Sequence, residues 1–199
     1  MIRGVKIFIV GVGGQGSLTL SRLLGEAALV EGRNVVVSEV HGMSQRGGVV
    51  ESTVLIGDFK SPLISAGDAD ILVSFEPVEA LRAAAFISKK TVAVINERKT
   101  VPFSVSIGQG KYPEVDEIIR LVASMAKSVH RFDAQTLAEK AGSALAMNTI
   151  FMGALHATDL LPISRQSFQQ TIKEKTPRRF VDSNLAAFEL GVQAVSSSS

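Results

Sequence analysis

The chain has 199 residues, of which 46% are hydrophobic, and this composition predicts one globular domain with a large core rather than a disordered chain. The net charge is only +2, and there is one tyrosine and no tryptophan, so neither charge nor base-stacking side chains favour nucleic-acid binding. Cysteine is absent, which excludes disulfides, thiolate nucleophiles and cysteine-bound iron–sulfur clusters from this chain.

The N-terminal segment shows no charged and apolar leader pattern before a strand that begins at Val5. Together with the absence of cysteine, this favours a cytoplasmic protein. The most apolar long stretch, Ala144 to Leu161, is interrupted by Asn148, His156 and Asp159. It falls short of the ~18 uninterrupted apolar residues of a membrane span. We expect a buried helix there and no membrane association.

The first elements are a strand, a glycine-rich loop and a helix. Residues Val5 to Val10 are rich in β-branched side chains, which predicts a buried strand. The glycine loop, Gly11-Val12-Gly13-Gly14-Gln15-Gly16, follows. Leucines and alanines at helical spacing then predict a helix that Gly32 ends. This order opens a doubly wound α/β domain, and the helix N-terminus after the loop offers N–H groups to an anion.

The later elements continue the alternation of strands and helices. We expect strands at 34–40, 49–56, 71–75, 91–95 and 128–132, an edge strand with an excursion between Thr100 and Pro113, and helices at 77–87, 114–126, 134–141, 144–160, 164–173 and 181–195. Asp133 and Ser164 are the expected N-caps of two helices. The pattern predicts a Rossmann-like α/β fold with a mostly parallel sheet, flanking helices and a helical C-terminal part. Residues 1–195 form one expected domain, followed by a disordered serine tail at 196–199.

The glycine loop matches the spacing of the dinucleotide-binding fingerprint. Glu39 stands at the end of the second strand, where such enzymes place an acid for the ribose hydroxyls. A stand-alone NAD(P)-dependent oxidoreductase is therefore one hypothesis. Gln15 adds an amide that the NAD loop does not generally need, and no Lys-Ser/Thr pair follows the glycines, which argues against a Walker-type site. Alternatively, the glycines serve only close packing of strand and helix.

A second loop, His41 to Gly48, carries the other candidate site residues. At the carboxyl edge of a parallel sheet the loops after the first two strands lie close together, so Gln45, Arg46 and Gly47 would come near the glycine loop. Arg46 can bind a carboxylate or phosphate through two hydrogen bonds, and it could equally pair with a nearby glutamate. His41 is a weak candidate for a catalytic acid or base, since a lone loop histidine is more often a surface residue.

The remaining polar residues give weaker signals. His130 and His156 stand in apolar contexts and are expected to be structural. No histidine pair with a carboxylate has metal-site spacing, so we expect no metal on this chain. Asn96, Asn148 and Asn184 could contact a ligand or serve turns and caps.

Several segments together resemble one family. They are Gly11 to Gly16, Glu39 to Gly48, Ser61 to Ile64, Phe75 to Arg82 and Asn184 to Gly191. The chain resembles the gamma-type domain of the 2-oxoacid (pyruvate or ketoisovalerate):ferredoxin oxidoreductases, and most of all the beta subunit of indolepyruvate ferredoxin oxidoreductase. The family usually continues its third strand with Val-Arg-Ile-Gly, whereas this chain has Val54-Leu55-Ile56-Gly57, so any contact of that arginine is missing.

The resemblance implies a non-cluster subunit that is inactive alone. Thiamine diphosphate, Mg²⁺ and the [4Fe–4S] clusters would belong to a large partner subunit, which decarboxylates the 2-oxo acid. Coenzyme A would accept the acyl group, and ferredoxin the electrons. No cofactor is expected on this chain alone, and the isolated chain could form a homodimer. The residues expected to contact coenzyme A, or the partner, are Gly13, Gly14, Gln15, Gly16, Gln45, Arg46 and Gly47. In a third hypothesis the chain is a scaffold that holds no ligand.

Overall fold

The computed structural model describes residues 4–41, 48–100, 105, 108 and 110–196. Its centre is a six-stranded sheet with the strand order β2-β3-β1-β4-β5-β6. The strands are β1 (Val5–Val12), β2 (Val35–His41), β3 (Val49–Ile56), β4 (Ile71–Ser74), β5 (Val92–Asn96) and β6 (Ser128–Phe132). Only β3 runs against the others, because it pairs antiparallel with both β1 and β2, while β1, β4, β5 and β6 pair in parallel. The predicted mostly parallel sheet is confirmed.

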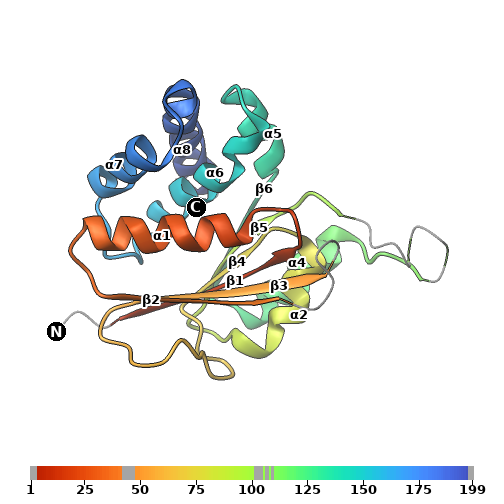
Figure 1. Ribbon diagram of the computed structural model, residues 1–199. Coiled ribbons are helices and arrows are strands. Elements are labelled where there is room, and N and C mark those ends of the chain that lie inside the picture. The colour runs from red at the N-terminus through yellow and green to blue at the C-terminus, as the bar shows by residue number, and fades with distance from the viewer. Residues whose placement is uncertain (1–3, 42–47, 101–104, 106–107, 109, 197–199) are drawn as a thin grey trace.

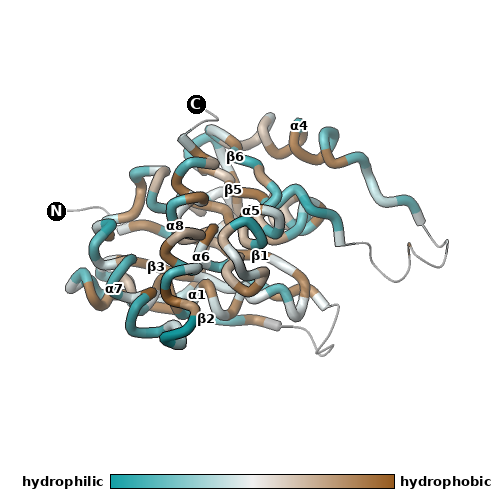
Figure 2. Tube along the Cα trace, turned by 90° about the horizontal axis from the view of Figure 1, so that it is seen from above, coloured by the Kyte–Doolittle hydropathy of each residue, from teal (hydrophilic) through white to brown (hydrophobic). Residues whose placement is uncertain are grey.

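Helices cover both faces of this sheet (Figure 1). One face carries α1 (Ser17–Val30), α5 (Ala134–Lys140), α6 (Met147–His156), α7 (Arg165–Lys175) and α8 (Val181–Ser196). The other face carries α2 (Pro77–Arg82) and α4 (Val115–Met125). Figure 2 shows the α6–α8 layer toward the viewer and α4 at the far end of the molecule. Within the described residues, no helix combines the length and apolarity needed to cross a membrane.

Both predicted helix caps are confirmed. The Asp133 carboxylate accepts a hydrogen bond from the Thr136 N–H at 2.9 Å. The Ser164 hydroxyl accepts one from the Ser167 N–H at 3.2 Å. In each case a short polar side chain satisfies a first-turn N–H group that has no partner within the helix.

Several predicted boundaries are wrong. Instead of one helix over 144–160, a 3₁₀ turn, η2 (Ala144–Ala146), precedes α6, and α6 ends at His156. The chain leaves the helix there because the Thr158 hydroxyl bonds the Leu155 carbonyl and Asp159 adopts a left-handed φ of 56°. The helix predicted over 77–87 divides into α2 and a 3₁₀ turn, η1 (Ala83–Phe86).

Two predictions concern segments that the structure describes only in part. Ser196, assigned to the tail, is the last residue of α8, whereas 197–199 lie outside the described residues. The edge strand predicted between Thr100 and Pro113 falls largely on residues that the structure does not describe, and the described Val105 is helical.

The core lies in two layers, one on each face of the sheet. On the α1 side Phe75 packs against Phe151 of α6, with ring centroids 4.4 Å apart. On the α2 side Leu55, which stands where the resembled family has arginine, is 1% exposed and belongs to the second apolar cluster. That position therefore contributes to packing in this chain.

Helices α6 and α8 meet backbone to backbone. A Cβ on Gly153 would lie 2.0 Å from the Phe188 carbonyl oxygen, and a Cβ on Gly191 would lie 2.0 Å from that of Ile150. Two glycines that face each other's helix thus allow the close crossing that holds the C-terminal helices over the sheet.

We predict that Gly153→Ala or Gly191→Ala lowers the free energy of unfolding by at least about 3 kcal/mol, because the helices must move apart. Urea unfolding measures it. Gly25→Ala is the matched control in α1, since its Cβ would meet only the Val37 side chain at 3.1 Å. We expect a change within about 1 kcal/mol there. Equal losses in all three variants would contradict this account.

His156 lies between Phe168 of α7 and Phe188 of α8, with both ring centroids 5.7 Å away. Burial lowers the pKa of His156, and Arg165 lowers it further, while Asp159 and Glu189 act in the opposite direction. The folded protein therefore prefers the neutral imidazole, as expected of a structural histidine.

Because the folded pKa lies below the unfolded value, the stabilisation by neutral His156 is present above about pH 6.5 and is lost as the pH falls through the folded pKa. We predict that wild type loses more stability than His156→Gln between pH 7.5 and 5.5 in urea unfolding. Subtracting the variant's loss removes the contribution of other groups, including His130. A loss of the same size in both proteins would rule this out.

Candidate functional site

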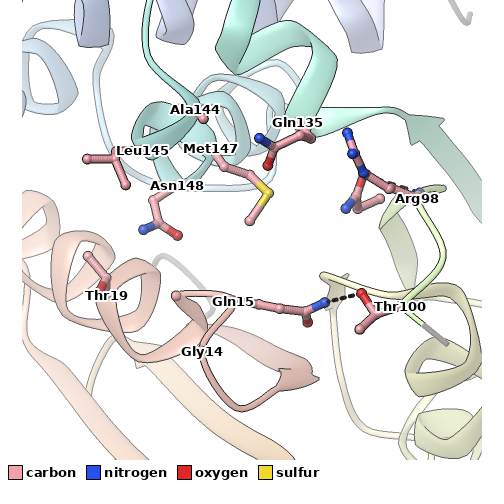
Figure 3. A pocket seen from close by; sticks show the side chains of 12 residues that line it. Gly14, Gln15, Thr19, Arg98, Thr100, Gln135, Ala144, Leu145, Met147 and Asn148 are labelled. Atoms are coloured by element: carbon pink, nitrogen blue, oxygen red, sulfur yellow. Dashed lines mark hydrogen bonds between the residues drawn. The ribbon is translucent and has the colours of Figure 1, made fainter. Parts of the chain in front are cut away.

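A cleft of about 660 Å³ opens at the carboxyl ends of β1 and β5 (Figure 3). The glycine loop and the start of α1 form one wall, and the segment after β5 forms another. Residues of α5, η2 and α6 form the third. The volume is within the range of small-molecule sites. Parallel strands bring loops distant in sequence to this edge, which is where α/β folds bind ligands.

The glycine loop presents its backbone to this cleft. Gly14 and Gly16 have φ angles of 98° and 94°, which favour glycine. A Cβ on Gly16 would also lie 3.0 Å from the Asn148 Nδ2. No side chain caps α1, and its first turn holds no acidic residue. The N–H groups and positive dipole end of this helix therefore suit an anion.

Arg98 contributes the single formal charge among the described residues that line the cleft. Its neighbours are used elsewhere, since Glu97 pairs with Arg131 at 3.8 Å and Lys99 with Glu114 at 3.7 Å. For the part of the chain that is described, Arg98 has no ion pair. A guanidinium and an uncapped helix N-terminus thus face one cleft whose described lining holds no carboxylate, an arrangement that attracts anionic ligands.

The third wall is partly apolar. Leu145 on η2 is 81% exposed, and Met147 lies beside it in the cleft. The Asn148 Oδ1 is buried and has no hydrogen-bond partner among the described residues. Figure 3 shows these side chains above the glycine loop. The cleft therefore suits a ligand with both anionic and apolar parts.

The other two candidate asparagines are structural. Asn96 is buried and joins segments by donating to the Phe75 carbonyl at 3.1 Å and accepting from the Ala134 N–H at 3.0 Å. Asn184 accepts from the Thr149 hydroxyl at 2.6 Å, within the α6–α8 layer.

The second loop is described only at its ends. Gln45, Arg46 and Gly47 lie outside the described residues, as does the side chain of His41, which ends β2. Their assignment therefore stays a prediction. Gly48, the last residue of this loop, accepts a hydrogen bond from the Gly13 N–H at 2.9 Å. The end of the second loop thus lies beside the glycine loop.

The expected route to this proximity was wrong. We expected the second strand to follow the first in a parallel sheet, but β3 returns antiparallel and takes the place between β1 and β2. This arrangement also weakens the dinucleotide hypothesis, because that fold places its ribose-binding acid on the strand next to the first. Glu39 instead accepts from the Ser21 hydroxyl at 3.2 Å and lies 3.6 Å from Arg22.

Glu76, which follows β4, is a buried carboxylate that the sequence did not single out. It is 1% exposed. One oxygen accepts from the N–H groups of Val78 at 2.8 Å and Glu79 at 3.2 Å, and so caps α2. The other accepts from the Thr100 N–H at 3.3 Å and from the Tyr112 hydroxyl. Burial and this carboxylate raise the pKa of Tyr112. The proline after Glu76 predicted a helix start but not this network.

Neither Arg98 nor Glu76 was among the predicted site residues. The run of three charges at 97–99, directly after a buried strand, was the available signal for Arg98. Within the described residues, no three His, Cys, Asp or Glu side chains gather as a metal site would require.

Comparison with known proteins identifies relatives over almost the whole chain. A family model described as pyruvate ferredoxin/flavodoxin oxidoreductase matches residues 6–194. The indolepyruvate oxidoreductase subunit IorB of Archaeoglobus fulgidus is 45% identical over 193 residues, which cover 96% of each protein.

Two solved structures share the fold. The gamma subunit of a keto/oxoacid ferredoxin oxidoreductase from Geobacter sulfurreducens has a TM-score of 0.70 at 21% identity, over 97% of this chain and 99% of that one. The 2-oxoglutarate:ferredoxin oxidoreductase of Magnetococcus marinus, solved with 2-oxoglutarate, coenzyme A and succinyl-CoA bound, has a TM-score of 0.71 at 18% identity. That match covers 99% of this chain but 32% of the other.

Proposed function

This chain belongs to the pyruvate ferredoxin/flavodoxin oxidoreductase family, and we propose that it is the non-cluster subunit of a 2-oxoacid:ferredoxin oxidoreductase acting on indolepyruvate or another arylpyruvate. The 45% identity to an indolepyruvate oxidoreductase subunit, over nearly the full length of both proteins, supports this substrate class. The complex would convert the 2-oxo acid to an acyl-CoA and carbon dioxide and pass the electrons to ferredoxin.

The partner in this proposal is a large subunit that carries thiamine diphosphate, Mg²⁺ and [4Fe–4S] clusters. Thiamine diphosphate there supplies the decarboxylation chemistry. The present chain has no cysteine to ligate a cluster, which agrees with this division. A cytoplasmic location, where thiols stay reduced, belongs to the same proposal.

The role of this chain would be to hold coenzyme A at the cleft. The observation that carries this is the uncapped N-terminus of α1 facing the same cleft as Arg98. Backbone N–H groups of Gly14 and Gly16 would bind phosphate. The Gly13 N–H holds Gly48 instead, and the 45–47 segment would complete the site beside it. The exposed Leu145 and Met147 suit the apolar parts of the ligand. His41 remains the candidate acid or base of this proposal.

We predict that co-expression with the large subunit gives arylpyruvate-dependent and coenzyme A-dependent dye reduction that neither subunit shows alone. The controls are omission of coenzyme A and calorimetric titration of the isolated chain with NAD(H), for which we expect no heat. Activity in the complex no higher than in the large subunit alone would reject the proposal. Binding of NAD(H) would favour the dinucleotide hypothesis.

We further predict that Arg98→Ala raises the KM for coenzyme A about tenfold with kcat unchanged, because it removes a charge-assisted contact made equally before and during reaction. Arg46→Ala should weaken coenzyme A use or assembly in the same assay. Arg120→Ala, an exposed arginine of α4 on the other face of the sheet, is the control and should match wild type. Unchanged kinetics and unchanged co-purification in both site variants would remove the arginines from the site.

A further inference from the structure

Both the oxygen and the nitrogen of the Gln15 side-chain amide make hydrogen bonds. Its Oε1 accepts a hydrogen bond from the Val12 N–H at 2.7 Å, across the glycine loop. Its Nε2 donates to the Thr100 hydroxyl at 3.0 Å (Figure 3). Gln15 follows β1 and Thr100 follows β5, and β4 lies between these strands. The amide therefore joins two walls of the cleft that the sheet alone does not connect.

Thr100 is itself fixed to the edge of the sheet. Its N–H donates to Glu76 at 3.3 Å, and Glu76 follows the intervening strand, β4. Glu76 cannot move without releasing the N–H groups that it caps in α2. Gln15, Thr100 and Glu76 thus form a line of hydrogen bonds across the ends of three strands, which we call the edge network.

The glycine loop needs such a connection. A Cβ at Gly14 would meet no atom within 4 Å, so packing does not hold the tip of this loop. Glycine backbone is also costly to order. Hydrogen bonds from Gln15 therefore supply order that packing does not. A loop ordered before binding spares the ligand that cost and increases affinity.

We propose that Gln15 is a positioning residue, which acts through the edge network to fix the glycine loop relative to the segment of Arg98. The proposal rests on the proposed function for the identity of the ligand, coenzyme A. In this proposal the Gln15 side chain acts through the edge network, whereas the backbone of the neighbouring glycines contacts the ligand directly. Glutamine suits the role because one amide supplies both the acceptor for Val12 and the donor for Thr100.

A double-mutant cycle in the assembled complex tests this proposal. Gln15→Met removes the amide at nearly constant shape, and Thr100→Val removes the hydroxyl but keeps the N–H that bonds Glu76. Thr100→Val should raise the KM for coenzyme A about two- to tenfold with kcat unchanged, the effect of one lost hydrogen bond. Gln15→Met loses two hydrogen bonds and should raise this KM by at least as much, again with kcat unchanged. The double variant should be no worse than Gln15→Met alone, and Thr100→Ser should match wild type.

The matched control is Gln135→Met, which removes another amide of the cleft. That amide donates to Glu139 at 2.9 Å, on the same helix, and not to Thr100. The factor by which Gln135→Met changes the KM for coenzyme A, whatever its size, should multiply with the factor for Thr100→Val. If the effects of Gln15→Met and Thr100→Val multiply instead, Gln15 contacts the ligand independently and the proposal is overturned. Unchanged KM values in both variants would overturn it as well.

A second readout needs no coenzyme A. In the full chain without ligand, hydrogen exchange of the Val12 amide should accelerate in Gln15→Met and in Thr100→Val, and stay slow in Thr100→Ser. Exchange unaffected by Thr100→Val overturns the edge network even if the complex proves inactive with coenzyme A. Conversely, if the wild-type complex is inactive with coenzyme A but exchange of the Val12 amide accelerates in the two variants, only the proposed function is rejected. Thermal melting of each variant checks that it folds.

Discussion

The Glu76 carboxylate holds together the parts of the chain that form the cleft. It is buried at the end of β4 and accepts hydrogen bonds from α2, from Thr100 and from Tyr112. A buried carboxylate is costly unless donors surround it, so this residue requires all of these segments in their places. Through Thr100 it reaches Gln15 and hence the start of α1. The network thus links the glycine loop to the segment after β5, two of the walls of the cleft.

The charges around the cleft follow from what the neighbouring residues do. Carboxylates around the cleft are engaged: Glu76 caps α2, Asp133 caps α5, and Glu39 is held by α1. What remains toward the cleft is the N-terminus of α1 and the guanidinium of Arg98. Such a site would attract and orient an anion. The described lining contains no histidine, carboxylate or lysine that would serve as a nucleophile or base, which fits a subunit that contributes binding to a partner's chemistry.

The sheet order explains why a fingerprint typical of dinucleotide enzymes stands in a protein of another family. Insertion of β3 next to β1 moves β2, with Glu39, one strand further from the loop. The glycine loop keeps its anion-binding backbone but loses the acid that would read a ribose. The same insertion brings Gly48, and with it the end of the second loop, to Gly13. One change of strand order therefore removes the geometry of a dinucleotide site while keeping the two loops side by side.

The sequence by itself determined the elements and the family. A run of β-branched residues predicted β1, and alternating residues predicted β3. Asp133 and Ser164 marked helix starts, and the motifs at 11–16 and 41–48 indicated the relatives, because each of these signals lies within a short stretch of chain. Only the tertiary structure decided that β3 separates β1 from β2, that Gly153 and Gly191 bring α6 against α8, and that Arg98 faces the cleft. Gln15 and Thr100 are 85 residues apart, and no local pattern links them. Their hydrogen bond exists because parallel strands end at one edge of the sheet, and the order of those strands is set by packing across the whole domain.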